Sequence, residues 1–153
     1  MLSLKSVEYS VGEFKLKADF KIPRLSKVAL IGPSGAGKST LLSLISGFLK
    51  PNSGSIIIDN EDVTTKLSNQ RRVTTIFQDG NLFPHLTVKK NISLGLRPDL
   101  RLNSAQQSVL DYAIDRVGLT DLVDRKPGSL SGGQQSRVSL ARALVRDCPL
   151  LLL

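Results

Sequence analysis

Hydrophobic and polar positions alternate along the first part of the chain. Residues 3–9 and 14–22 alternate, as expected of strands that bury one face. A short uninterrupted apolar segment, 28–31, predicts a buried strand, and a second apolar segment, 56–58, predicts another strand. Residues 73–77 are β-branched or aromatic and predict a further strand. We therefore expect this part of the molecule to be rich in β-structure.

The spacing of apolar residues changes to a helical period in three other segments. The first covers residues 38–46, with leucine or isoleucine at 41, 42, 44 and 45, and Gly47 is expected to cap its C-terminus. The second opens with a capping box in which Ser104 is the N-cap and Gln107 the N3 residue, and Gly118 should follow its end. The apolar face expected for this helix consists of Val109, Leu110, Ala113, Ile114 and Val117.

The third helix is predicted to follow Ser131 and to stop before Pro149. Its expected apolar face consists of Val138, Ala141, Leu144 and Val145. The last residues, 150–153, are all leucine and predict the start of a buried strand. Strands and helices thus alternate around the middle of the chain, which is typical of an α/β fold.

A glycine-rich segment lies between the predicted strand 28–31 and the predicted helix 38–46. It matches the pattern G-x-x-x-x-G-K-[ST], and strand, loop and helix are the context which that pattern requires. Glycines let backbone N–H groups turn toward an anion, and a helix N-terminus adds partial positive charge. We expect Lys38 to reach the β and γ phosphates of a nucleotide and Ser39 to bind Mg²⁺. The predicted nucleotide-binding residues are Gly32, Pro33, Ser34, Gly35, Ala36, Gly37, Lys38, Ser39 and Thr40.

A second glycine-rich turn, residues 130–134, precedes the third predicted helix. Ser131 occupies the N-cap position, and two glycines, Gly132 and Gly133, leave the following N–H groups accessible. The same argument about helix N-termini makes this turn a candidate anion site that includes Gln134. A plain helix cap is the alternative, and the short motif alone favours it.

Composition and charge narrow the class of protein. The chain has 153 residues, enough for one domain with a hydrophobic core, and no apolar segment is long enough to span a membrane. No signal peptide is predicted at the N-terminus. A single cysteine, Cys148, excludes an internal disulfide. The net charge is +8, but the basic residues are dispersed and not interleaved with aromatics, so no nucleic-acid partner is expected.

These motifs together resemble the ATP-binding subunits of ABC transporters. Residues 32–40 match the Walker A motif, Gln78 matches the Q-loop glutamine, and residues 130–144 match the signature motif with its helix. Tyr9 lies where the family places an aromatic ring on adenine, with Phe14 as a nearby competitor. The resemblance extends over the whole chain.

The resemblance implies a P-loop NTPase (RecA-like) α/β core with an antiparallel β subdomain and a helical subdomain that carries the signature. On this division residues 1–31 are mainly β, 32–84 form the P-loop core and 85–130 the helical subdomain. Residues 131–153 would then hold the signature helix and the start of the Walker B strand. The family's Walker B aspartate and catalytic glutamate follow that strand. The resemblance therefore implies a chain truncated before these residues, which is expected to have little or no ATPase activity alone.

The resemblance also implies a mechanism and partners. Two subunits would bind two ATP molecules head to tail, with Mg²⁺, between the P-loop of one and Ser131–Gln134 of the other. Lys38 and Gln78 would act in catalysis, and Gln78 would also bind Mg²⁺ or the attacking water. Residues near 80–96 would contact integral membrane permease subunits. A periplasmic substrate-binding protein would deliver the substrate to those subunits. Such a subunit is peripheral, at the cytoplasmic face of the bacterial inner membrane.

Residues 81–88, 91–96 and 100–107 resemble the branch of the family that imports thiamine and thiamine phosphates. An importer of another substrate, such as iron or polyamines, is an alternative, and so is an inactive nucleotide-binding remnant. Chromosome-maintenance and DNA-repair ATPases share both glycine-rich motifs but insert a long coiled coil between them, and residues 40–130 hold no sustained heptads. Soluble ribosome-associated members usually carry two cassettes, whereas one is present here.

Overall fold

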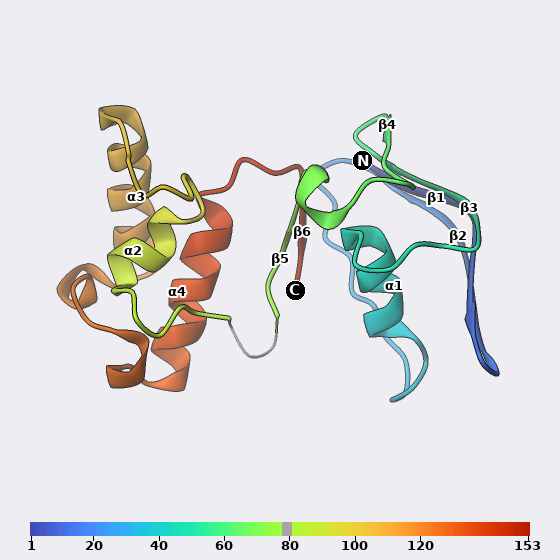
Figure 1. Ribbon diagram of the computed structural model, residues 1–153, viewed down its shortest axis with the longest axis horizontal. Coiled ribbons are helices and arrows are strands. Elements are labelled where there is room, and N and C mark those ends of the chain that lie inside the picture. The colour runs from blue at the N-terminus through green and yellow to red at the C-terminus, as the bar shows by residue number, and fades with distance from the viewer. Residues whose placement is uncertain (78–80) are drawn as a thin grey trace. The chain divides into compact units, whose positions relative to one another are not determined.

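The computed structural model describes residues 1–77 and 81–153, so Gln78 lies outside the described residues. The chain forms two compact units (Figure 1). The first consists of residues 1–73 and 148–152, and the second of residues 74–147 and 153. The subdomain boundaries expected from the sequence stay a prediction.

The first unit is built on a four-stranded antiparallel sheet. Its strands are β1 (Leu2–Val11), β2 (Phe14–Ile22), β3 (Ser53–Ile58) and β4 (Glu61–Asp62), in the order β2-β1-β3-β4. The strands expected at 3–9, 14–22 and 56–58 are confirmed. The pairing register shifts between Leu4 and Val7, where Ser6 has a φ of 46°. This bulge explains why burial along β1 does not alternate strictly.

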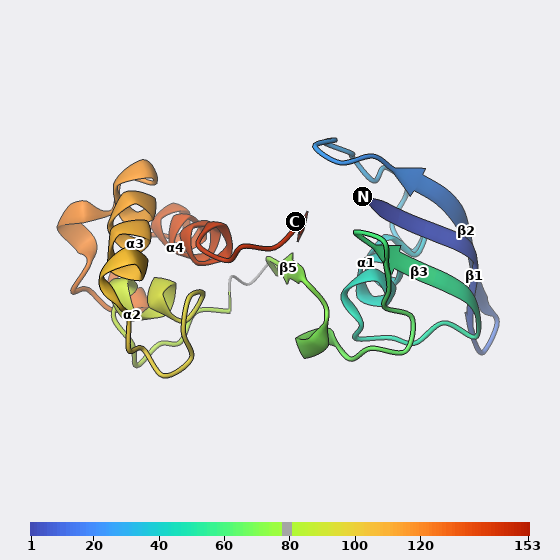
Figure 2. The same cartoon turned by 90° about the horizontal axis from the view of Figure 1, so that it is seen from above.

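Helix α1 (Lys38–Ser46) packs against one face of this sheet (Figure 2). Its buried residues join the sheet in one core, which includes Leu4, Val7, Leu44, Ile45 and Ile56. The helix ends at Gly47, whose φ of 83° is left-handed and whose N–H bonds to the Leu44 carbonyl. The predicted helix and its glycine cap are therefore confirmed.

The prediction of a strand at residues 28–31 is wrong. No strand is assigned there, and Val28, Leu30 and Ile31 are 63%, 44% and 90% exposed. A strand needs a neighbouring backbone to complete its hydrogen bonds, and none of the described strands pairs with this segment. Its apolar composition is therefore insufficient to form a strand, although the segment does lead into the glycine-rich loop.

Two short strands, β5 (Val73–Thr75) and β6 (Leu150–Leu152), form a separate two-stranded sheet. Strand β5 stops short of the predicted end at residue 77. The strand expected at 150–153 is present, but only Leu152 is buried within it, whereas Leu151 is 39% exposed.

The second unit is helical. Its helices are α2 (Val88–Ser93), α3 (Ser104–Arg116) and α4 (Gly132–Leu144). Short 3₁₀ turns lie at Thr120–Leu122 and Pro127–Ser129 in this unit and at Ser68–Gln70 in the first unit. Val88, Ile92, Leu110, Leu119 and Val138 are fully buried at its centre. The apolar faces predicted for α3 and α4 included Val109 and Leu144. That prediction is wrong for these two residues, because they are 46% and 55% exposed. No helix in the described parts of the chain is long and apolar enough to cross a membrane.

The capping box of α3 lies one residue before its predicted place. Asn103 is the N-cap: its Oδ1 accepts from the Gln106 N–H at 2.9 Å, and Gln106 Oε1 accepts from the Asn103 N–H at 3.1 Å. Gln107 instead donates to Asp111 along the helix. Both Asn and Ser are good N-cap residues, so residue type alone does not distinguish position 103 from position 104. The prediction that Gly118 follows the helix end is confirmed, since it has a φ of 64° next to the C-cap Val117.

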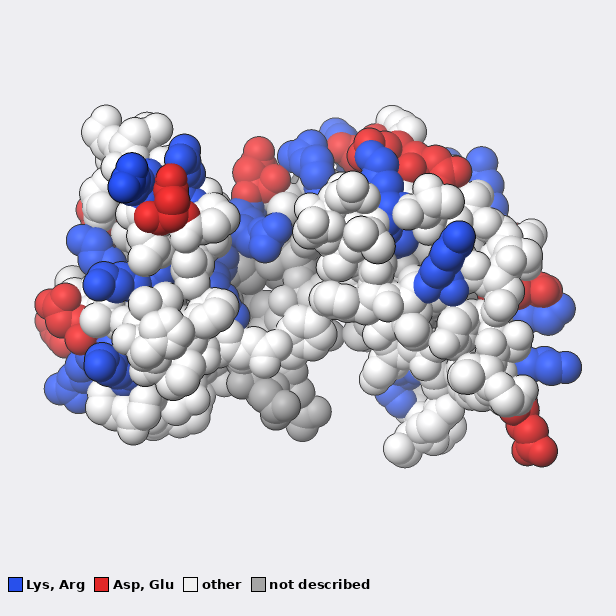
Figure 3. All heavy atoms as spheres, viewed as in Figure 1, with Lys and Arg blue, Asp and Glu red and all other residues white. Residues whose placement is uncertain are grey.

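Charged side chains of both signs are interspersed on the face drawn in Figure 3. The edge strand β2 carries lysines on its outward side, which discourages pairing with other chains. One of them, Lys17, lies 2.6 Å from Glu8 on β1 and lowers the pKa of that carboxyl through a hydrogen bond and charge attraction. Asp59 likewise has a lowered pKa, chiefly because Arg24 donates to it.

Candidate nucleotide-binding site

The glycine-rich loop lies exposed at the N-terminus of α1. Gly35 and Gly37 have φ values of 82° and 87°, a region that residues with a Cβ avoid. Space around Gly37 is also limited, because a Cβ there would lie 2.9 Å from Phe14 Cζ on β2. The Ala36 N–H donates to the Pro33 carbonyl at 3.3 Å and closes the turn. The loop conformation thus depends on glycine at Gly37, which the motif specifies, and at Gly35, which the motif leaves open.

Lys38 folds back over this loop. Its Nζ donates to the Gly32 carbonyl at 2.8 Å and to the Pro33 carbonyl at 2.7 Å. These neutral acceptors hold the ammonium group at the loop that precedes α1. A phosphate is a stronger, charged acceptor, so it can replace these carbonyls at little cost.

The first turn of α1 suits an anion with a bound cation. Ser39 lies there with an exposed side chain, and Thr40 follows it half-buried. The turn, all of it described, carries no acidic residue that would offset the partial positive charge of the helix N-terminus. The backbone N–H groups, the Lys38 ammonium and the Ser39 hydroxyl therefore fit a nucleotide phosphate chelated to Mg²⁺.

Two aromatic residues were candidates for an adenine contact. Tyr9 is half-buried, stands opposite Leu16 in the β1–β2 pair and packs on the core of the first unit. Phe14 is the residue whose ring approaches Gly37 in the loop. Stacking of adenine on Tyr9 stays a prediction, and Phe14 contributes to the shape of the loop.

The second glycine-rich turn is the N-terminus of α4. Ser131 is the N-cap: its Oγ accepts from the Gln134 N–H at 3.3 Å, and Gln134 Oε1 accepts from the Ser131 N–H at 2.8 Å. A Cβ added at Gly132 or Gly133 would meet nothing within 4 Å. The predicted N-cap is confirmed, and the two glycines leave an open face at the helix end. Anion binding at this face stays a prediction.

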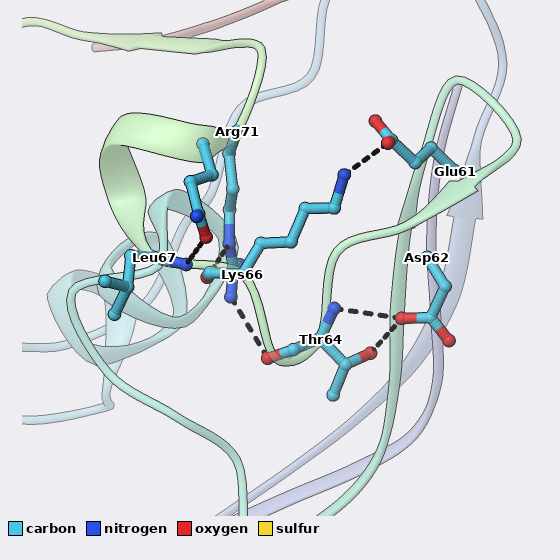
Figure 4. A network of polar contacts seen from close by, with 7 residues as sticks. Glu61, Asp62, Thr64, Lys66, Leu67 and Arg71 are labelled. Atoms are coloured by element: carbon cyan, nitrogen blue, oxygen red, sulfur yellow. Dashed lines mark hydrogen bonds and ion pairs between the residues drawn. The ribbon is translucent and has the colours of Figure 1, made fainter.

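Arg71 supports the other end of α1, and no sequence pattern pointed to it. It is 4% exposed, and its guanidinium donates to the carbonyls of Leu44 and Ile45 at 2.7 and 2.9 Å. It also donates to Lys66 and Thr64 carbonyls, and Asp62 bonds to Thr64 beside it (Figure 4). Burial lowers the Arg71 pKa, while the Asp62 charge opposes that shift. A buried cation at the helix C-terminus thus satisfies carbonyls that would otherwise lack donors.

The comparison with protein families decides the identity of the fold. The family described as "ABC transporter" matches residues 16–153. The chain belongs to the ABC transporter family. Its α/β architecture is accordingly that of a P-loop NTPase, with an antiparallel sheet and a helical part.

Curated relatives agree with this assignment. The chain is 50% identical over 153 residues to the thiamine import ATP-binding protein ThiQ of Shigella sonnei and 48% identical to that of Yersinia pestis. It covers all of its own length but only 66% and 65% of those two proteins. The chain therefore spans slightly less than two thirds of the relatives that it matches.

Solved structures of ABC cassettes superpose on the chain. One is a dimeric ATP-binding cassette in a post-hydrolysis state bound to ADP and Pi, with a TM-score of 0.81 and 31% identity over 99% of this chain and 72% of that one. Another is a nucleotide-free cassette from an ABC transporter, with a TM-score of 0.82 and 27% identity over 98% of this chain and 66% of that one.

Proposed function

We propose that this chain is part of the ATP-binding subunit of a bacterial importer, which binds ATP with Mg²⁺ and hydrolyses it to ADP and phosphate. The observation that carries the proposal is the loop of residues 32–37 with Lys38 at the N-terminus of α1, in a chain of the ABC transporter family. Lys38 would move from its two loop carbonyls to the β and γ phosphates. The Ser39 hydroxyl would bind Mg²⁺, which shields the phosphate charge.

Two further roles follow from the same proposal. Gln78 would position Mg²⁺ or the attacking water, a role that falls outside the described residues. Two copies would bind ATP head to tail, with residues 131–134 of one copy facing the γ-phosphate held by the other. The open N-terminus of α4 supports this arrangement, since it offers N–H groups to an anion. A related cassette was also solved as a dimer.

Replacing Gly133 with aspartate tests the proposed role of α4. Because a Cβ there meets nothing within 4 Å, G133D should fold, and a carboxylate in the first turn suits the helix dipole. The new charge would repel the γ-phosphate, so we expect ATP-driven dimerisation of the whole protein to weaken by about 10-fold or more. Light scattering at increasing ATP concentration, with Mg²⁺ omitted to prevent hydrolysis, measures this.

The matched control is G128D, which adds the same charge in the same unit where a Cβ also has open space. It should dimerise like the wild type. Equal dimerisation of G133D and the wild type would remove residues 131–134 from the proposed site, without affecting the assignment of the P-loop.

The permease contact is proposed at a groove of about 400 Å³ in the second unit. Apolar side chains line it, including Phe77, Phe83 and Leu94. Thr74 also lines it, and its buried Oγ1 has no hydrogen-bond partner among the described residues. A mixed apolar and polar surface of this kind suits a helix presented by a membrane subunit. The subunit would then be peripheral, at the cytoplasmic face of the inner membrane.

We propose thiamine and its phosphates as the transported substrate, on the basis of the two named relatives. No residue of this chain need contact the substrate, which the membrane subunits and a periplasmic binding protein would select. Uptake of labelled thiamine into vesicles that contain the whole complex should require ATP inside and the binding protein outside. Uptake of iron or a polyamine instead of thiamine would reassign the substrate and keep the ATPase.

A further inference from the structure

Arg142, on α4, connects the signature helix to the segment of residues 81–87. Its Nη1 donates to the Asn81 carbonyl at 2.9 Å. The same guanidinium lies over the Phe83 ring, 5.9 Å from the ring centre. A guanidinium donates hydrogen bonds in its own plane and can lie with its face over an aromatic ring. The two interactions together fix both the position and the orientation of the segment that it contacts.

The same segment is fixed from its other side by Asn91, on α2. Asn91 is fully buried, and its Oδ1 accepts from the Phe83 N–H at 2.8 Å. Its Nδ2 donates to the carbonyls of Phe83, Leu86 and Thr87 at 3.0–3.1 Å. Phe83 is therefore held by α2 through its backbone and by α4 through its ring.

The Phe83 ring remains 45% exposed despite these contacts, and it lines the groove described above. Burial lowers the pKa of Arg142, and the nearby charge of Arg146 adds to this effect. A partly buried cation next to another cation is unfavourable unless acceptors compensate, and the Asn81 carbonyl and the ring face are acceptors of this kind. The contact with Asn81 and Phe83 thus compensates the burial of the Arg142 cation.

We propose that Arg142 is a positioning residue that makes residues 81–87 and α4 move as one body. A displacement of the exposed Phe83 by a docked partner would then reach Ser131 and Gln134 at the far end of α4. The mechanical connection stands on the contacts alone. Its effect on nucleotides rests on the function proposed above.

Hydrogen exchange on the chain itself tests the connection. The amides to follow are Phe83, which donates to Asn91, and Leu86, which donates to the Phe83 carbonyl at 3.1 Å. In R142M both should exchange about 10-fold faster, because the segment loses a charged hydrogen bond and the ring contact. R142K keeps the charge but not the planar fork, so it should restore protection only in part.

The matched control is R137M, which removes another arginine of α4, one that donates to the Val117 and Gly118 carbonyls instead. It should leave the Phe83 and Leu86 amides at the wild-type rate. Wild-type exchange of these amides in R142M would overturn the proposal. So would an equal acceleration at Ile114 in the core of the unit, since that would indicate general destabilisation.

The effect on nucleotides is measured in the whole protein assembled with its permease. The readout is the ratio of ATP turnover with and without the permease, which should fall several-fold toward one in R142M and persist in R137M. A wild-type ratio in R142M would overturn the coupling. If the wild-type protein shows no stimulation at all, the proposed importer function fails, while the exchange result still decides whether Arg142 holds the segment.

Discussion

Replacing Lys38 with alanine is expected to abolish measurable ATP binding. The ammonium group is held by two backbone carbonyls of the glycine-rich loop, so it already lies at the proposed phosphate site. The substitution removes the charge that would contact two phosphates, and charge-assisted hydrogen bonds are among the stronger polar contacts. We expect the dissociation constant to rise by about 100-fold or more, measured by calorimetry with a non-hydrolysable ATP analogue.

K50A provides the control for this experiment, because Lys50 is an exposed lysine in the same unit, beyond the end of α1. It should bind the analogue like the wild type. A circular dichroism spectrum would establish that K38A is folded, as expected from the exposed position of the loop. If K38A kept the wild-type affinity, the phosphate site would have to lie elsewhere.

Features set by local interactions could be predicted from the sequence. The glycine-rich loop, helix α1 and its Gly47 cap lie where the pattern placed them, because φ values and hydrogen bonds within a few residues decide them. The capping box of Ser131 and Gln134 is local in the same sense. The box of α3 was misplaced by one residue, since Asn103 and Ser104 are both good caps and only the backbone conformation distinguishes them.

Features set by distant partners could not be predicted. Residues 28–31 have the composition of a buried strand, but a strand also needs a partner backbone, which no composition specifies. Leu144 was expected to be buried from its spacing, yet it is the last residue of α4 and is exposed. The hydrogen bonds of Asn91 and Arg142 described above end on backbone N–H and carbonyl groups, which residues of almost every type have, so no motif reveals them.

Arg71 is the clearest such case, and R71M is expected to lower the free energy of unfolding by about 3 kcal/mol. Methionine has a similar length but no donors, so the Leu44 and Ile45 carbonyls at the buried end of α1 would lose their partners. Urea denaturation followed by circular dichroism measures the change.

The adjacent R72M variant provides the comparison, because Arg72 is exposed and surface substitutions usually cost less than about 1 kcal/mol. R71K should fall between the two, since lysine keeps the charge but cannot donate to four carbonyls in one plane. Helix α1 has only nine residues, so fraying of its last turn would also disturb the N-terminus that carries Lys38. We therefore expect R71M to weaken binding of the ATP analogue as well as stability. Equal losses of stability in R71M and R72M would show that the guanidinium does not support helix α1.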